Sequence, residues 1–384
     1  MKILFYKWRV FNQEDIKSAL EELGHEVTFY AESDEVRWGR DRRELTEAVA
    51  GYDAVFSVNY FSRVSEACNE KGKKYIAWTV DSPMISMYNR SLFNECNYIF
   101  VFDKFDYFRF KAIGAKNLYY MPLAVNTKRI DGLIASAGKE ELKKYDSDIS
   151  FVGSLYYKNS YDDIKGSLTD YLRGYLDSAM WAQMDIFGEN IFDKMLTPDI
   201  LEQLLEIVEF KQEEEAFSDF KLVFTNTYLG FKLAQTERIY CLNRLARHFN
   251  VDLYCDSDSE ELAGVNNRGT VNYINDMPKV FNRSKINMNF TIRNIRSGLP
   301  LRMWDVLGAG GFLLTNFQVE LPEYFENGKD LVYYEDMNDM ERKAEYYLSH
   351  EDERLEIARN GHDKVKKFHS YRDRLEKMFE IVGE

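Results

Sequence analysis

Two arginines followed by a Ser-Gly-Leu-Pro tetrapeptide form the part of this sequence whose residue types and spacing most clearly indicate chemistry. Arg293 and Arg296 follow an apolar run, and the tetrapeptide at 297–300 opens an expected helix. Guanidinium groups donate in a fork that suits a diphosphate, and the free N–H groups at the start of a helix bind anions. The segment therefore predicts a diphosphate site made by Arg293, Arg296, Ser297, Gly298 and Leu299.

An arginine and an aspartate follow on the expected helix at 300–307. Arg302 and Asp305 are three residues apart, so their side chains share one face of that helix. The carboxylate of Asp305 can accept both hydroxyls of a ribose, and Arg302 can add charge to the diphosphate site. In the alternative interpretation, Arg302 only pairs with Asp305, and the two loop arginines are ordinary surface charges.

Further candidates stand at the ends of expected strands, where parallel sheets bind ligands. Gly153 and Ser154 end a strand at 149–152 and extend the expected phosphate site. Tyr254 and Tyr273 stand at strand ends on the nucleotide side, where each either stacks on a base or closes the edge of the core.

One acidic residue in the first half of the chain is a candidate catalytic group. Asp81 follows a strand at 75–79 and precedes Ser82 and Pro83. Its carboxylate either orients an acceptor hydroxyl as a general base or caps the turn before the proline.

Short apolar runs alternate with polar, helix-period stretches along most of the chain, which is typical of strand-helix units around a parallel sheet. The pattern predicts the α/β class with two doubly wound, Rossmann-like domains. The expected strands are residues 2–6, 26–31, 54–58, 75–79, 98–102 and 118–121 in the first half, and 149–152, 251–255, 270–273, 286–290, 312–315 and 331–334 in the second.

The expected domain boundaries follow from changes in this pattern. Residues 1–126 form the first domain, and the lysine-rich stretch 127–148 is a crossover linker. Residues 149–370 form the second domain, and the acidic, helix-forming stretch at about 160–234 is an insertion without strands. Ligands of such folds bind at the carboxyl ends of the strands, so we expect a cleft between the two sheets.

Composition argues against several classes of function. The 384 residues carry 50 Lys and Arg against 64 Asp and Glu, and the net charge of −14 disfavours nucleic acid as a partner. Four cysteines without paired spacing indicate a reducing, cytoplasmic location. We expect no signal peptide and no transmembrane segment, and the five histidines show no metal-binding spacing.

Several of these segments resemble one known family. The stretch 286–315, INMNFTIRNIRSGLPLRMWDVLGAGGFLLT, looks like the donor-binding half of glycosyltransferases of the two-domain GT-B architecture. It is most similar to the spore-maturation CgeB-like group, often described as glycosyltransferase family 1. Residues 268–289, FVGSLY at 151–156 and WTVDSP at 78–83 resemble other parts of the same family. The resemblance spans most of the chain and is most specific from residue 268 to 371.

The resemblance implies an activity and a division of labour between the domains. The second domain would bind a nucleotide-sugar donor, and the first would bind the acceptor, which is a protein, a glycan or a small molecule. The reaction would need neither cofactor nor metal, since Asp256-Ser257-Asp258 matches a metal-binding triplet only by its letters. A C-terminal helix at 371–384 would pack back toward the first domain.

One position departs from the family pattern. Many retaining members carry two glutamates eight positions apart, and here Ser297 and Asp305 take those places. The ribose role survives at Asp305, because aspartate keeps both acceptor oxygens. The sugar-side acidic role has no counterpart at Ser297, so the sequence does not indicate a retaining or an inverting reaction.

The expected function is therefore the transfer of a sugar from a nucleotide-sugar donor to an acceptor. The alternative is a non-catalytic protein of the same fold that binds a nucleotide sugar or a glycan, and turnover distinguishes the two. A hydrolase or epimerase would share the donor site, and analysis of the product would identify it.

Overall fold

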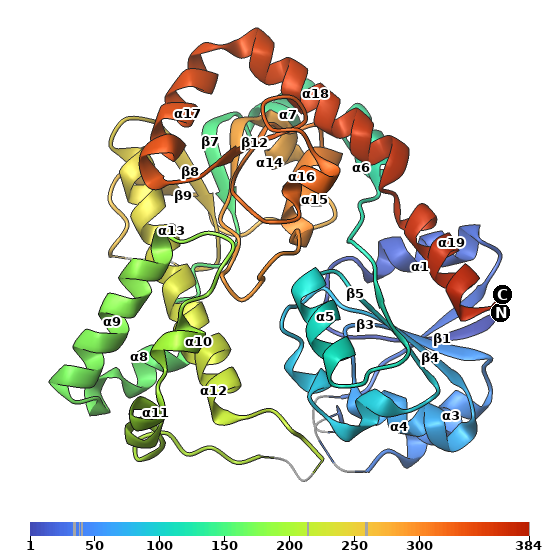
Figure 1. The fold of residues 1–384 in the computed structure, drawn as a ribbon. Helices are drawn as coiled ribbons and strands as arrows, with labels where there is room; N and C mark the ends of the chain where they lie inside the picture. Colours follow the sequence, from blue (N-terminus) through green and yellow to red (C-terminus); the bar gives the residue numbers. More distant parts are fainter. Residues whose placement is uncertain (34–35, 38, 40, 213–214, 258–259, 384) are drawn as a thin grey trace. The chain divides into compact units, whose positions relative to one another are not determined.

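The computed structural model describes residues 1–383 except 34–35, 38, 40, 213–214 and 258–259 (Figure 1). The chain divides into two compact units. The first unit comprises Met1–Ala124, Gln212–Ser218 and His369–Glu384, and the second comprises Val125–Lys211 and Asp219–Phe368. Each unit contains a six-stranded sheet with flanking helices, so the predicted α/β fold with two Rossmann-like domains is confirmed.

The sheet of the first unit runs in the order β2-β1-β3-β4-β5-β6, and every strand pair is parallel. Its central strand β3 is buried along its whole length, as its continuous apolar sequence requires. Helices connect most successive strands, because parallel neighbours need crossovers. The strands are β1 (Lys2–Tyr6), β2 (Glu26–Tyr30), β3 (Ala54–Val58), β4 (Lys74–Trp78), β5 (Asn97–Val101) and β6 (Leu118–Tyr120). The helices and 3₁₀ turns are α1 (Gln13–Glu22), α3 (Arg43–Ala50), α4 (Ser62–Lys71), η1 (Ile85–Met87), η2 (Arg90–Phe93) and α5 (Lys104–Ala112).

The last helix of the chain, α19 (Tyr371–Val382), belongs to the first unit. It packs against α1, and Tyr371 meets Trp78 edge-on with ring centroids 5.9 Å apart. The side-chain amine of Lys74 donates to the carbonyl of Val382 at 2.8 Å. A capping box of Ser370 and Asp373 begins the helix.

A short segment from the middle of the chain also joins the first unit. Within Gln212–Ser218, Ala216 forms an antiparallel bridge with Asn89. Phe217 packs edge-on against Tyr88, with ring centroids 5.7 Å apart. The sequence does not predict this contact, because the segment is short and carries no strand pattern.

The sheet of the second unit runs in the order β12-β11-β10-β7-β8-β9, again with parallel pairs throughout. The strands are β7 (Ser147–Val152), β8 (Val251–Tyr254), β9 (Val265–Asn267), β10 (Ser284–Asn289), β11 (Leu313–Asn316) and β12 (Val332–Tyr334). The expected strand at 270–273 is not one, and β9 takes the edge of the sheet instead. The backbone N–H groups of Ile274 and Asn275 bond to the side chain of Asn272, so this stretch forms a turn.

Helices cover both faces of the second sheet (Figure 1). The stretch predicted as a linker at 127–148 contains α6 (Thr127–Ser136) and α7 (Lys139–Lys143) and belongs to the second unit. The expected insertion is helical, with α8 (Ser160–Ile164), η3 (Lys165–Ser167), α9 (Asp170–Met184), α10 (Phe192–Met195), α11 (Pro198–Leu205), α12 (Phe220–Val223) and the π-helix η4 (Phe224–Leu229). The remaining helices are α13 (Gly230–Ala246), α14 (Met277–Arg283), α15 (Leu301–Gly308), α16 (Leu321–Tyr324), α17 (Met337–Ser349) and α18 (Glu351–Phe368).

The insertion shares one hydrophobic core with the second sheet. Leu172 and Leu176 of α9 are buried in the same cluster as Ile149 of β7 and Leu253 of β8. The insertion is therefore an integral part of the second unit, although its sequence lacks the strand-helix alternation of the rest.

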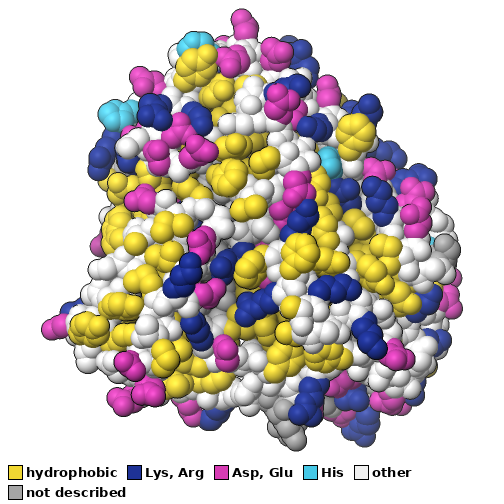
Figure 2. Space-filling view, viewed as in Figure 1, with side chains coloured by type: hydrophobic (Ala, Val, Ile, Leu, Met, Phe, Trp, Pro, Cys, Tyr) yellow, Lys and Arg dark blue, Asp and Glu magenta, His cyan; other side chains and the backbone are white. Residues whose placement is uncertain are grey.

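The charge of the surface concerns binding to nucleic acid, and the length and apolarity of the helices concern membrane spanning. On the face shown in Figure 2, acidic and basic side chains are interspersed, so the net charge of −14 is not gathered there into one field. Among the residues that the structure describes, no helix is both long enough and apolar enough to cross a membrane.

Candidate functional site

The loop between β10 and α15 carries most of the predicted site, and side chains at the end of the neighbouring strand hold its first residues. The backbone N–H of Thr291 donates to the side chain of Asn316 at 2.7 Å, and Asn289 donates to the hydroxyl of Thr315 at 2.9 Å. Both acceptors lie in β11. The loop is thus fixed at the carboxyl edge of the sheet, where ligands of doubly wound folds bind.

Arg293 is buried in this loop and forms an ion pair. Its side chain is 6% exposed, and its Nη2 donates to Oε1 of Glu237 on α13 at 2.7 Å. The guanidinium also lies 4.2 Å from the ring centroid of Phe187 and donates to the carbonyl of Met184. Burial raises the pKa of Glu237, and the charge of Arg293 opposes that shift. Arg293 is therefore directed into the protein and not toward a ligand.

Arg296 is less deeply buried than Arg293, with 16% of its side chain exposed. Its Nη1 contacts Oδ2 of Asp193 on α10 at 3.0 Å, and Asp193 itself is half exposed. The next residue, Ser297, donates from its hydroxyl to the buried carboxylate of Glu320 at 2.7 Å. The sequence does not indicate a role for Glu320, because this residue follows a strand by several positions and belongs to no recognisable motif.

The start of α15 is held from two sides. Pro300 is the residue before the first helical turn, so the helix begins at Leu301. The indole of Trp304 donates to the carbonyl of Leu299 at 3.3 Å, and the amide of Gln318 approaches the carbonyl of Gly298 at 3.4 Å. Both contacts use carbonyl groups, so neither occupies an N–H group at the start of the helix, where anions bind in proteins. The N–H of Met303 donates to the carbonyl of Pro300 at 3.0 Å.

Asp305 contacts two other predicted site residues. Its Oδ1 accepts a hydrogen bond of 2.9 Å from the hydroxyl of Tyr273, and its Oδ2 lies 3.3 Å from Nη1 of Arg302. The carboxylate is almost fully buried, and Tyr273 is 9% exposed. Arg302 also contacts Met277 and lies over the ring of Phe281. Asp305, which is expected to bind the ribose, is thus in direct contact with Tyr273, which is one of the two residues expected to bind the base.

The turn after β7 is held by an arginine that no sequence motif marks. Arg238 of α13 donates to the backbone carbonyl of Ser154 and, at 2.9 Å, to that of Phe290. It therefore ties the carboxyl ends of β7 and β10 together. Gly153 packs against its neighbour Phe151, since an added Cβ would lie 3.0 Å from that ring. Arg238 is 8% exposed on a helix that is largely buried, and no local motif identifies it.

Tyr254 is the last residue of β8 and is 5% exposed. Burial raises the pKa of its phenol, with the charges of Asp252 and Arg268 acting in opposite directions. Its burial at the end of the strand agrees with the interpretation as an edge of the core. In this structure the ring of Tyr254 offers little surface for stacking on a base.

Asp81 follows β4 in the first unit and forms a compact polar turn with Asn59. Asn59 donates to Oδ2 of Asp81 at 2.7 Å and accepts from the backbone N–H of Val80 at 2.9 Å. Asn59 has a positive φ of 67°, which is a strained conformation common at functional sites. Asp81 keeps an exposed face, yet burial by surrounding protein raises the pKa of its carboxyl, and the bond from Asn59 partly opposes this.

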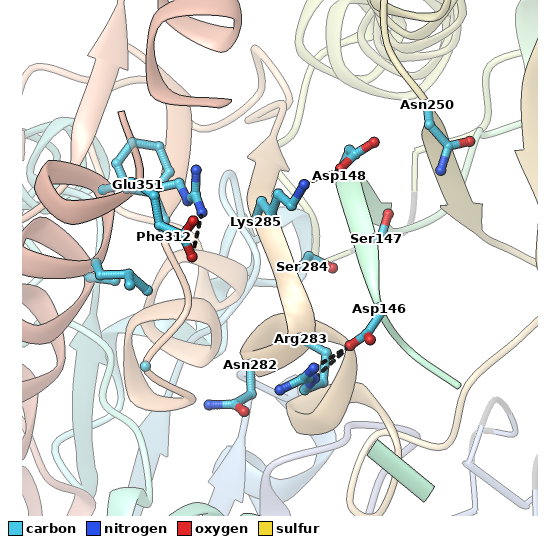
Figure 3. A pocket seen from close by; sticks show the side chains of 14 residues that line it. Asp146, Ser147, Asp148, Asn250, Asn282, Arg283, Ser284, Lys285, Phe312 and Glu351 are labelled. Carbon is cyan, nitrogen blue, oxygen red and sulfur yellow. Dashed lines mark hydrogen bonds and ion pairs between the residues drawn. The ribbon is translucent and has the colours of Figure 1, made fainter. Parts of the chain in front are cut away.

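A pocket of about 440 Å³ lies at the opposite edge of the second sheet, where β7 and β10 begin (Figure 3). Ion pairs between Arg283 and Asp146 and between Lys285 and Asp148 occupy most of the charged groups that line it. None of the predicted site residues lines this pocket.

In the described part of the chain, no group of three or more His, Cys, Asp or Glu side chains is placed to hold a metal ion. Asp258, the third residue of the Asp-Ser-Asp triplet, lies outside the described residues.

Comparisons with known proteins bear on both units. Residues 238–380, which are less than half of the chain, match a family model described as glycosyl transferase-like. No curated protein matches the sequence. Among solved structures, the chain is similar to Anabaena HepE (Alr3699) in complex with UDP and glucose, with a TM-score of 0.56, 10% identity and full coverage of both chains. The fold is that of GT-B glycosyltransferases.

Two further structures have the same fold. The T4 phage protein BGT in complex with its substrate UDP-glucose is similar with a TM-score of 0.52, 12% identity and full coverage of both chains. A glycosyltransferase from Rickettsia africae is similar with a TM-score of 0.52 and 12% identity over 100% of this chain and 99% of the other. At these identities, the likeness establishes the architecture.

Proposed function

We propose that the protein is a glycosyltransferase that moves a sugar from a nucleotide-sugar donor to an acceptor, as the CgeB-like resemblance implies. The observation that carries the proposal is the cluster of Asp305, Tyr273 and Arg302 beside the start of α15, at the carboxyl edge of the second sheet. This segment lies within the region that matches the glycosyl transferase-like family. The GT-B fold and two similar structures that hold UDP or UDP-glucose support the same donor class.

The proposed donor site stabilises the negative charge of the leaving diphosphate. Transfer breaks the bond between the anomeric carbon and a diphosphate oxygen and forms a bond from that carbon to an acceptor oxygen. Arg296, Arg302 and the N–H groups at the start of α15 would hold the diphosphate, which gains charge as the bond breaks. Arg296 would exchange its contact with the half-exposed carboxylate of Asp193 for a contact with the diphosphate. These cations supply the charge in a mechanism that we propose to be independent of metal ions and cofactors.

Arg293 receives a different role from the one that its sequence position suggests. Its buried pairing with Glu237 commits the guanidinium to the protein. We therefore assign Arg293 to holding the loop in place, so that Arg296 and Ser297 face the ligand. Asp305 remains the proposed ribose ligand, and Tyr273 would orient its carboxylate.

In this proposal, Asp81 acts on the acceptor. As a general base it would take the proton of the acceptor hydroxyl while the new bond forms. A raised pKa suits this role, because a stronger base accepts a proton more readily at neutral pH. We expect Asp81→Asn to lower kcat by about a hundredfold or more with the affinity for UDP unchanged.

The location in a reducing cytoplasm remains a prediction that agrees with four free cysteines.

The test measures release of nucleoside diphosphate from a panel of nucleotide sugars, with and without EDTA. The proposal expects at least one donor to be consumed, with no loss of rate in EDTA, and an acceptor to accelerate the release. Binding of a nucleotide sugar without turnover under any acceptor condition would instead support a non-catalytic binding protein of the same fold. A loss of rate in EDTA would contradict independence from metal.

A further inference from the structure

A second pocket in the second unit lies between three helices that are distant in sequence. It has a volume of about 410 Å³ and is lined by residues of α9, α13 and the start of α17. Helix α13 packs against both α9 and α17. The volume of this pocket is typical of pockets that bind small molecules. None of the residues proposed to bind the nucleotide lines it.

Two aromatic side chains form a corner in this pocket. Trp181 of α9 is 53% exposed and Tyr240 of α13 is 37% exposed, and their rings meet at 89° with centroids 5.7 Å apart. A tryptophan normally buries most of its large surface, so leaving this one in solvent costs free energy that packing would recover. A ligand with an apolar face would cover the corner.

The polar groups around this corner include both hydrogen-bond acceptors and donors. In the part of the chain that the structure describes, the carboxylate of Asp185 has no hydrogen bond or ion pair. Among the described residues, the donors to Asp336 are the backbone N–H groups of Asn338 and Asp339, and both donate to its Oδ1. The indole N–H of Trp181 has no acceptor among the described residues.

Arg244 is the only cation among the described residues that line the pocket, and a carboxylate neutralises it. Arg244 donates to the carboxylate of Glu341 at 2.7 Å and to the amide oxygen of Asn338. The second contact leaves the NH₂ group of Asn338 as a donor. The pocket thus offers two carboxylates and two neutral donors beside exposed rings, without a free positive charge.

We propose that this pocket is a second carbohydrate site, separate from the nucleotide site, that binds a neutral oligosaccharide. A sugar ring has an apolar C–H face that packs on aromatic rings, and its hydroxyls both donate and accept, which matches the mixed polar groups. An anionic ligand would face Asp185 and Asp336, and a cationic ligand would leave the N–H groups of Trp181 and Asn338 unmatched. The inference goes beyond the proposed function and does not depend on it, because the two sites take different ligands.

The experiment uses the full chain and three neutral probes: maltotriose, cellotriose and tri-N-acetylchitotriose. Saturation-transfer NMR is recorded with and without excess UDP, and titrations give the affinities. We expect at least one trisaccharide to bind equally well with UDP present. Trp181→Ala should weaken that binding about tenfold, which corresponds to ~1.4 kcal/mol. Asp185→Asn should weaken it less.

The matched control is Tyr171→Ala, because Tyr171 is 66% exposed on the same helix and does not line the pocket. This variant should bind the sugar as the unmodified protein does. Separate titrations with UDP measure binding at the proposed nucleotide site. A loss of UDP binding can therefore be distinguished from a loss of trisaccharide binding in this pocket. Three results would each overturn the proposal: no trisaccharide binds, Trp181→Ala binds normally, or choline binds at Trp181 and the sugars do not.

Discussion

Buried charge is the main feature of the candidate site at the scale of single residues. Arg293 and Arg296 stand three positions apart in one loop, yet their surroundings differ. The side chain of Arg293 is 6% exposed and pairs with Glu237, whereas Arg296 pairs with a half-exposed carboxylate. The residue types predict an anion site at this loop. They do not tell which arginine faces inward, because that depends on Glu237, which lies 56 positions earlier in the chain.

The ion pair of Arg293 should matter mainly for stability. Removing one partner of a buried pair leaves the other charge buried without compensation. Glu237→Gln should therefore lower the free energy of unfolding by ~3–5 kcal/mol, as measured by chemical denaturation. The control is Glu209→Gln, because Glu209 pairs with Lys211 at the surface and should contribute little. Equal effects of the two substitutions would contradict the role given to Arg293.

Asp81 should make stability depend on pH in a defined direction. Its pKa is raised above the ordinary value of 3.8, so the folded state binds the proton more tightly than the unfolded state. The resulting stability is fully present below the ordinary pKa and is lost as pH rises through the raised pKa. Asp81→Asn removes this loss and can keep the contact with Asn59.

The variant should therefore gain stability relative to the unmodified protein between pH 4 and pH 7. Thermal unfolding of both proteins across this range measures the difference. A difference that stays constant with pH, or that falls as pH rises, would show that burial does not raise the pKa of Asp81.

At the scale of elements, the insertion helices support the candidate loop. Gly230, the first residue of α13, lies so close to Asn294 that an added Cβ would be 2.0 Å from its side-chain oxygen. Asn294 in turn donates to the carbonyl of Asn226 in the π-helix at 3.0 Å. The sequence predicts a helical insertion, but it does not indicate that the insertion fixes the β10–α15 loop.

Substitution of this glycine should loosen the loop. Gly230→Ala should cost ~1–3 kcal/mol of stability, because the methyl group displaces Asn294, and should also weaken UDP binding. Gly174→Ala on α9 is the control, because nothing lies within 4 Å of its Cβ position. That variant should be unchanged or more stable by up to ~1 kcal/mol. Chemical denaturation and UDP titration measure both, and the account fails if the two glycines behave alike.

The strands were the easiest elements to predict, and the exceptions have local causes. Runs such as Ala54–Val58 are apolar at nearly every position, because both faces of a central parallel strand are buried. The stretch 270–273 contains valine and tyrosine, but Asn272 bonds to the backbone that follows and forms a turn. Side-chain turns of this kind depend on geometry that apolar patterning does not record.

At the scale of the whole molecule, residues from both ends of the sequence complete the first unit. Leu375 of α19 is fully buried, whereas Ile381 on the same helix is 39% exposed. Leu375→Ala should lower the stability of the first unit by ~2–5 kcal/mol and Ile381→Ala by much less. Scanning calorimetry with UDP separates the units, because a ligand raises the transition only of the unit that binds it. Equal effects of both substitutions would contradict the packing of α19.

The two-unit architecture was predictable from the sequence, whereas the long-range additions were not. Strand-helix alternation on each side of residue 149 predicts two sheets. Two of these additions join positions that are far apart in the chain. Ala216 forms a bridge with Asn89, and Arg238 donates hydrogen bonds at the ends of two strands. No local sequence pattern indicates such contacts.

The central claim is that the β10–α15 segment binds a nucleoside diphosphate, and calorimetric titration of UDP tests it most directly. Arg296→Ala should weaken UDP by ~1.5–3 kcal/mol, or roughly 10- to 150-fold, because it removes a charge-assisted bond to the diphosphate. Asp305→Asn should also weaken it, and Arg359→Ala, an exposed arginine on α18, should not. Full UDP affinity in a well-folded Arg296→Ala protein would contradict the claim.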